Sequence, residues 1–249
     1  MPASFKTEAV VLRSIRYGEA DRVLHLYSAD RGRIGAMAKG VRRVRSRFGG
    51  RLEPLSRVRL VCHQGRGDLV TVTAADTVDA HPHLREGRAA LERGAEACAA
   101  VLRLLDSAEP NPAAYNLLCH ALSLLDSDPA GASRPRALAF RAKLLLASGF
   151  APELASCATC GEAEHLSGFS PAAGGVVCAS CTSQGGFPWD PPERGSFPLG
   201  EEAHGFLVDA LGRPLADAPD AADQALRQAD RALAETLEFH AHVRLARVA

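Results

Sequence analysis

Apolar and polar residues alternate with the two-residue period of β-strands through the first 80 residues of the chain. In residues 57–62 the alternation is strict, with Val58, Leu60 and Cys62 on one face. Short apolar runs separated by glycine or charged turns predict five strands, at 9–16, 22–27, 33–38, 57–62 and 69–78. We expect a small closed barrel, because closure pairs the edges that short strands would otherwise expose.

The hydrophobic period lengthens to that of an α-helix beyond residue 84. Helices are predicted at 91–105, 113–125, 135–147, 200–211 and 220–244, and Gly149 is placed to cap the third. Residues 152–198 are rich in Gly, Pro and Cys and lack the apolar periodicity of a self-supporting domain. The prediction is an α+β multidomain chain with three parts: a barrel at 1–80, an α-helical domain at 81–151 and 199–249, and an inserted module at 152–198.

The composition allows a folded core but shows a strong charge asymmetry. The 249 residues are 47% apolar, and no run of 18 apolar residues suggests a membrane span. Because the N-terminus lacks an apolar signal core, we expect a cytoplasmic protein. Residues 1–70 hold 15 Lys and Arg against 6 Asp and Glu, which leaves 14 against 23 in the remainder. A basic first segment of this kind indicates a polyanionic partner.

Two Cys-x-x-Cys pairs predict a metal site inside the inserted module. Cys157 and Cys160 form the first pair, Cys178 and Cys181 the second, and 17 residues separate the pairs. Such spacing favours one structural Zn²⁺ held by four thiolates, which would order a segment that burial cannot order. A redox dithiol is the weaker alternative, since two pairs are present. A catalytic zinc is disfavoured because four thiolates leave no position for water. We interpret Cys62, Cys98 and Cys119 as buried apolar residues.

The sequence between the third and fourth predicted strands is the strongest candidate binding site. Residues 39–51 hold six cations, and no acid occurs between Asp30 and Glu53. Such a loop could be merely solvated, or could form an extended arm. We instead predict contacts to phosphates, with Phe48 offering a ring to unstacked bases, on a barrel of the size of the oligonucleotide-binding (OB) fold. The predicted DNA-binding residues are Lys39, Arg42, Arg43, Arg45, Arg47, Phe48 and Arg51.

Motifs for catalysis are absent from the sequence. There is no phosphate-binding Gly-x-x-x-x-Gly-Lys-Ser/Thr loop and no Gly-x-Ser-x-Gly nucleophile elbow. Glu19 and Asp21 share a turn with Arg16 and Arg22, so ion pairing is expected there rather than a nuclease centre. The protein is therefore predicted not to be an enzyme and to have no small-molecule substrate.

Several segments resemble the bacterial RecO recombination mediator family in order and spacing. In the first part they are 17–21 (YGEAD), 31–33 (RGR), 38–43 (AKGVRR), 46–47 (SR) and 52–55 (LEPL). Further along they are 140–146, 149–152 (GFAP), 157–161, 169–171 (FSP) and 174–175 before Cys178. The resemblance covers about residues 5–181, whereas the ending RLARVA lacks the basic-Ser element often found in the family.

The resemblance implies a function without catalysis. Members of the family have an OB barrel, bind single- and double-stranded DNA and anneal complementary strands. With RecR they help RecA to replace single-strand-binding protein (SSB) in the RecF pathway, and some carry a zinc module. The cations at 134, 136, 141 and 143 are a weak candidate for the SSB tail, or simply pair on a helix surface. An RNA-binding OB and zinc-ribbon accessory factor is the main alternative, and a metal-dependent nucleic-acid enzyme the third.

Overall fold

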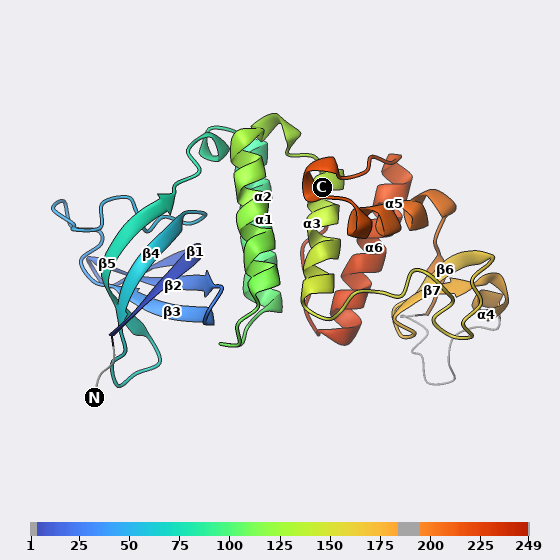
Figure 1. Ribbon diagram of the computed structural model, residues 1–249, viewed down its shortest axis with the longest axis horizontal. Helices are drawn as coiled ribbons and strands as arrows, with labels where there is room; N and C mark the ends of the chain where they lie inside the picture. The colour runs from blue at the N-terminus through green and yellow to red at the C-terminus, as the bar shows by residue number, and fades with distance from the viewer. Residues whose placement is uncertain (1–3, 184–194, 249) are drawn as a thin grey trace. The chain divides into compact units, whose positions relative to one another are not determined.

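The N-terminal strands form a closed barrel in the computed structural model, which describes residues 4–183 and 195–248. The strands are β1 (Ser4–Tyr17), β2 (Asp21–Ser28), β3 (Gly32–Ala38), β4 (Arg57–His63) and β5 (Val70–Asp79). Their order around the barrel is β1-β2-β3-β5-β4, and only β3 and β5 run parallel (Figure 1). All five predicted strands are confirmed, as is the OB-type barrel within an α+β fold.

Alternation along the strands fills the barrel with apolar side chains. In β3, every second residue from Gly32 to Ala38 is buried, and the residues between are half-buried. Leu24 and Leu26 of β2 join this interior, as do Phe48 and Leu52 of the loop that follows β3. The loop therefore contributes to the barrel core although most of its residues are polar or charged.

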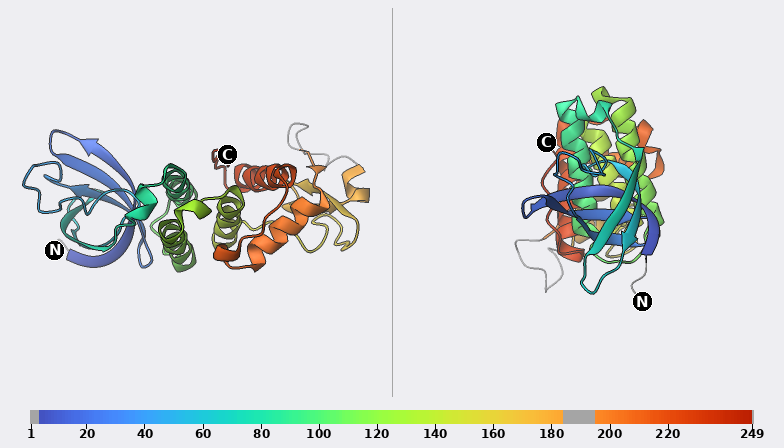
Figure 2. Two further views of the ribbon diagram at one scale, coloured as in Figure 1. Left: turned by 90° about the horizontal axis from the view of Figure 1, so that it is seen from above. Right: turned by 90° about the vertical axis from the view of Figure 1, so that its left-hand side faces the viewer.

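Two long helices belong to the same compact unit as the barrel, residues 1–132. They are α1 (Arg88–Leu104) and α2 (Pro112–Ser127), which lie side by side in Figures 1 and 2 and follow the short 3₁₀ helix η1 (His83–Arg85). The Asn111 side chain caps α2 by accepting from the main-chain N–H of Ala114 at 3.0 Å. Gly94 packs closely, since a Cβ there would lie 3.4 Å from side-chain carbons of Leu55, Leu84 and Leu122.

The second compact unit, residues 133–249, is built on three helices. These are α3 (Arg134–Ala147), α5 (Glu201–Gly212) and α6 (Asp223–His240). The predicted cap of α3 is confirmed: Gly149 has a φ of +79°, and the next amide, of Phe150, donates to the Leu145 carbonyl at 2.8 Å. The last helix ends at His240 rather than at the expected residue 244. None of the helices within 4–183 and 195–248 is long and apolar enough to cross a membrane.

A small three-stranded sheet belongs to the second unit. It has the order β7-β6-β8, formed by β6 (Leu166–Ser170), β7 (Gly175–Cys178) and β8 (Phe197–Pro198), and the short α4 (Ala179–Ser183) follows β7. The 3₁₀ helices η2 (Pro129–Gly131) and η4 (Leu215–Asp217) complete the elements that we describe. The separation of this module from the helical domain, predicted at 152 and 198, stays a prediction.

Candidate nucleic-acid interface and metal centre

The segment between β3 and β4, residues 39–56, is termed here the basic loop. It is built from consecutive turns, in which the amides of Arg43, Ser46 and Arg51 each donate to the carbonyl three residues earlier at 2.9–3.2 Å. Turns of this kind shorten the segment, so the loop is compact and not the extended arm considered from the sequence.

All six predicted cations of the basic loop are exposed to solvent. Arg51 donates to the main-chain carbonyls of Arg47 and Phe48, and Arg42 donates to that of Gly18 at 3.5 Å. No ion pair with an acid is found for the six within the described part of the chain. Their positive charges are therefore available to a polyanion. The six are Lys39, Arg42, Arg43, Arg45, Arg47 and Arg51.

Phe48 does not offer its ring to solvent, which corrects the role predicted for it. The side chain is 1% exposed and packs into the barrel core with Leu52. Arg47 covers the ring, with its guanidinium carbon 4.9 Å from the ring centroid. The ring thus anchors the loop to the barrel, and it cannot stack on a base in this conformation. The spacing of Phe48, Leu52 and Leu55 was the sequence signal for an anchor.

Three hydrogen bonds connect the basic loop to the turn between β1 and β2. The Gly40 amide donates to Asp21 Oδ1 at 2.7 Å, and the Arg42 amide donates to the Ala20 carbonyl at 2.9 Å. The third is the bond from the Arg42 guanidinium to Gly18. Asp21 therefore positions main chain, instead of pairing with Arg22 as expected. Tyr17 lies at the end of β1 beside this turn and is 58% exposed.

Several other arginines of the barrel are engaged in ion pairs. Arg57 and Arg59 both lie against Glu8, and Arg22 pairs with Glu53 at 2.9 Å. Because each of these guanidinium groups has a carboxylate partner, which Arg57 and Arg59 share, they add less to the positive surface than the loop cations do. Arg13 and Arg16, in contrast, are exposed.

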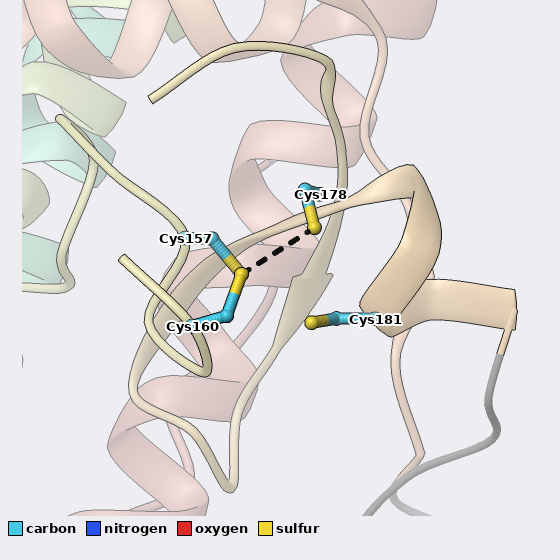
Figure 3. A group of neighbouring side chains, drawn as sticks. All are labelled: Cys157, Cys160, Cys178 and Cys181. Atoms are coloured by element: carbon cyan, nitrogen blue, oxygen red, sulfur yellow. Dashed lines mark hydrogen bonds between the residues drawn. The ribbon is translucent and has the colours of Figure 1, made fainter. Parts of the chain in front are cut away.

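The four predicted metal ligands come together in the second unit. Cys157 and Cys160 reach the site from the first knuckle, Cys178 from the end of β7, and Cys181 from α4 (Figure 3). All four sulfurs lie within 4.8 Å of one another, and the Sγ atoms of Cys160 and Cys178 are 3.7 Å apart. Four thiolates around one tetrahedral zinc, each at about 2.3 Å, would be separated by about 3.8 Å. These residues could therefore hold a metal ion.

Main-chain groups prepare the first knuckle for a negatively charged sulfur. Burial opposes ionisation of Cys157, but N–H groups of Cys178, Cys160 and Thr159 outweigh it and lower the pKa of the thiol to about 6. The Gly161 amide donates to the Cys157 carbonyl at 2.8 Å, and Gly161 has a φ of +79° that favours glycine. Such a knuckle fits the anionic sulfur that metals bind.

The remaining cysteines lie in apolar surroundings, as the sequence predicts. Cys62 is buried in the barrel core, and Cys98 and Cys119 are buried on the helices of the first unit. Burial raises the pKa of Cys62 to about 11 and that of Cys98 to about 12. These thiols stay protonated at neutral pH and act as small apolar side chains.

Three cations of α3 are engaged within the second unit. Arg134 pairs with Asp223 at 2.6 Å, and Lys143 donates to the Leu211 carbonyl at 2.9 Å. Arg141 is buried and pairs with Asp230 at 2.8 Å. Of the two interpretations of this cluster, the structure supports internal pairing rather than a site for an acidic tail.

Comparison with known proteins assigns both parts of the chain to one family. Residues 1–81 match the family model described as "Recombination protein O N terminal", and residues 94–246 match "Recombination protein O C terminal". The two matches lie in order along the chain and together cover most of it.

Curated relatives agree with the family models over most of their own length. The chain is 40% identical over 234 residues to "DNA repair protein RecO" of Rubrobacter xylanophilus, covering 92% of this chain and 90% of the relative. The proteins of the same name from Cutibacterium acnes and Desulforudis audaxviator are 38% identical over 189 residues and 35% over 191. These matches cover 73% and 76% of this chain, and 76% and 73% of the two relatives. With an OB-type barrel, a helical body and a cysteine cluster, the chain belongs to the RecO family of DNA repair and recombination proteins.

Proposed function

We propose that the protein binds single- and double-stranded DNA through the basic loop and anneals complementary strands. With RecR, it would help to load RecA onto SSB-coated DNA in the RecF pathway, acting at the nucleoid in the cytoplasm. It would do so as a binding protein and not as an enzyme. Membership of the RecO family supports the repair role, and the names of the relatives state DNA repair.

The single observation that carries the proposal is that the cations of the basic loop are exposed and form no ion pair with an acid in the described part of the chain. Arginine guanidinium groups bind phosphate oxygens in pairs of hydrogen bonds, and each contact releases condensed counterions from the nucleic acid. The loop is fixed to the barrel by Phe48 and to the β1–β2 turn by Asp21, so less of its conformational freedom is lost on binding.

Annealing follows from contacts that neutralise phosphates and leave base edges unread. Two single strands repel one another, and a cationic surface offsets that repulsion. Base-specific hydrogen bonds would hold the edges that must pair, whereas contacts to the backbone carry no sequence information. The loop cations can contact phosphates in this way without recognising particular bases.

The four cysteines are proposed to hold one structural Zn²⁺. The donor set supports zinc, because four thiolates close the coordination shell of a tetrahedral ion. The ion would supply cross-linking between the first knuckle, β7 and α4. RecR and the C-terminal tail of SSB are the proposed protein partners.

The deciding experiment is annealing of complementary strands coated with SSB, followed by fluorescence. A variant with Ala at Arg42, Arg43, Arg45 and Arg47 should lose most of the annealing rate while its circular dichroism stays unchanged. A control variant with Ala at Arg57 and Arg59, which share the carboxylate of Glu8, should retain most of the annealing rate. An unchanged rate in the loop variant would overturn the proposal.

Salt dependence gives a second test of the loop. If all six cations met phosphates of a single strand, log K would fall against log salt with a slope of about −4. Removal of four arginines should flatten the slope to about −1. A wild-type slope shallower than about −1 would contradict phosphate contact by the loop. Competition by an RNA strand of matched sequence that equals or exceeds DNA would favour the RNA-binding alternative.

A further inference from the structure

The four cysteines of the metal centre differ in how far solvent reaches them. Cys157 and Cys178 are buried and Cys181 is half-buried, whereas Cys160 is exposed. The exposed sulfur belongs to the first knuckle, where residues 159–165 all lie at the surface. A dissolved reagent therefore meets Cys160 before it meets the other three sulfurs.

A second sulfur lies beside that of Cys160. The Sγ atom of Cys178 is 3.7 Å from the Sγ atom of Cys160, a contact marked by the dashed line in Figure 3. Bonded sulfurs lie about 2 Å apart, so a movement of about 1.7 Å would let the two form a disulfide. Cys178 ends β7, and the bond would therefore join the first knuckle to the sheet.

Cys157, the other cysteine of the first knuckle, is less available to react. Its sulfur accepts hydrogen bonds from the main-chain N–H groups of Cys178, Cys160 and Thr159, and the residue is 2% exposed. Stabilisation of a thiolate lowers its nucleophilicity. Cys178 is therefore the better partner for an oxidised Cys160.

The charge around the site selects the kind of oxidant. Residues 152–183 contain Glu153, Glu162 and Glu164 and neither Lys nor Arg. Four thiolates around one Zn²⁺ add a net charge of about −2. Glu162 and Glu164 are exposed in the same knuckle as Cys160. Such a surface repels an anionic oxidant but not an uncharged hydroperoxide.

We propose that Cys160 is a site of reversible oxidation by an uncharged hydroperoxide, and that a disulfide between Cys160 and Cys178 releases the metal. The inference rests on the structural zinc of the proposed function. With hydrogen peroxide, the Cys160 thiolate attacks one oxygen and the O–O bond breaks, which gives a sulfenic acid and hydroxide. The Cys178 thiolate then attacks the Cys160 sulfur, the S–S bond forms and a second hydroxide leaves.

The two thiolates together lose two electrons, which the peroxide takes up with two protons from solvent to form two molecules of water. Two of the four ligand sulfurs are thereby withdrawn from the ion, and Cys157 and Cys181 alone hold it far more weakly. A thiol reductant breaks the disulfide by exchange and restores the four ligands. The metal content of the module thus follows the concentration of peroxide.

The test treats the zinc-loaded full chain with hydrogen peroxide and follows free zinc with a metallochromic dye. About one zinc should be released for about two thiols lost, and a dithiol reductant with added zinc should reverse both changes. The cysteines of the first unit, which are buried among apolar side chains, should keep their thiols. These are Cys62, Cys98 and Cys119.

Cleavage after glutamate identifies the disulfide, because it separates the two cysteine pairs. Cys157 and Cys160 fall in the peptide 154–162, and Cys178 and Cys181 fall in the peptide 165–193. Tandem mass spectrometry should find the two peptides linked through Cys160 and Cys178. A disulfide confined to the peptide 154–162, or zinc release without a link between the peptides, would overturn the inference.

Two substitutions by histidine test the order of attack without removing a ligand, because an imidazole nitrogen also binds zinc. Cys160→His should slow the release of zinc by peroxide at least about tenfold, since the exposed thiolate is gone. The matched control, Cys181→His, keeps both reacting sulfurs and should release zinc as fast as the wild type does.

Metal analysis of each chain before oxidation separates the two proposals. An unchanged rate of release in zinc-loaded Cys160→His would overturn the inference and leave the metal centre standing. An untreated wild type without zinc would remove the proposed metal centre itself. If Cys160→His fails to bind zinc, the peptide map of the oxidised wild type decides alone.

Discussion

The amide of Gly40 donates a hydrogen bond of 2.7 Å to the carboxylate of Asp21 and so joins the start of the basic loop to the β1–β2 turn. Gly40 has a φ of +68°, and a side chain there would be strained. The carboxylate thus sets the direction in which the loop leaves β3.

Two substitutions of Asp21 should distinguish the effect of its negative charge from its role as a hydrogen-bond acceptor. Asp21→Ala removes the bond to Gly40, and the resulting freedom of the loop should weaken single-strand binding about fivefold, corresponding to roughly 1 kcal/mol. Trypsin should also cut after Arg42 and Arg43 faster. Asp21→Asn keeps an acceptor and removes a negative charge near the DNA, so its affinity should equal or exceed that of the wild type. Equal losses in the two variants would contradict a positioning role.

Removal of the metal should unfold the cysteine module and spare the barrel. A strong chelator, or Cys157→Ser with Cys178→Ser, should expose residues 152–183 to proteolysis and to hydrogen exchange, since little apolar area holds them. Binding of DNA at the basic loop should change less than twofold. Metal analysis should give one zinc per chain for the wild type and for Cys98→Ala, a buried cysteine outside the cluster. Retention of metal by the double variant would contradict the assigned ligands.

Arg141 and Asp230 form a buried ion pair. We therefore expect the free energy of unfolding to fall much more when Arg141 alone is replaced than when both residues are replaced. Arg141 donates to Asp230 at 2.8 Å and to the Ala246 carbonyl at 2.8 Å. Arg141→Ala leaves the carboxylate with far less compensation and should lower the free energy of unfolding by about 3–5 kcal/mol. The double change to Leu at both positions should lose much less, measured by urea denaturation. A double variant as unstable as the single one would show that packing, not charge, dominates here.

Protonation of Asp30 is expected to cause part of the loss of folding stability at low pH. Burial opposes ionisation, but hydrogen bonds from the Ser28 and Thr7 hydroxyls and the charge of Arg31 outweigh it, so the pKa of Asp30 lies below its usual 3.8. The ionised form is therefore favoured by folding. The stabilisation is present above the unfolded pKa and disappears as the pH falls through the folded pKa.

Asp30→Asn should accordingly lower stability at neutral pH and flatten its decline at pH values below about 4. Thermal unfolding across that range provides the measurement, and Asp68→Asn, another exposed acid of the barrel, is the control for loss of one charge. A decline as steep as that of the wild type would exclude Asp30 as a source of the acid sensitivity.

The strands, most of the helices and the ligand set of the metal centre follow from local patterns in the sequence. Alternation located β1 to β5 because one face of each strand fills the barrel, and the helical period located α1, α2, α3, α5 and α6. The cysteine spacing identified all four residues of the cluster that could hold a metal ion, because a knuckle with two intervening residues lets both sulfurs reach one ion.

The parts that sequence reasoning missed depend on tertiary contacts. Phe48 sits among arginines in the sequence, yet its ring fills the barrel, since the turns of the basic loop direct it inward. The last helix stops at His240, after which the chain returns so that the Ala246 carbonyl meets Arg141.

The start of β3 packs closely against the connection between α1 and α2. A methyl group on Gly32 would lie 2.3 Å from the carbonyl oxygen of Glu109, and the Arg33 amide donates to the Ser107 carbonyl at 3.1 Å. The Tyr115 hydroxyl of α2 donates a hydrogen bond to the Glu8 carboxylate of β1. A fragment cut at residue 81, where the first family match stops, would strip these supports from the barrel wall. A fragment that ends near residue 132 would instead keep the barrel together with both helices of its compact unit.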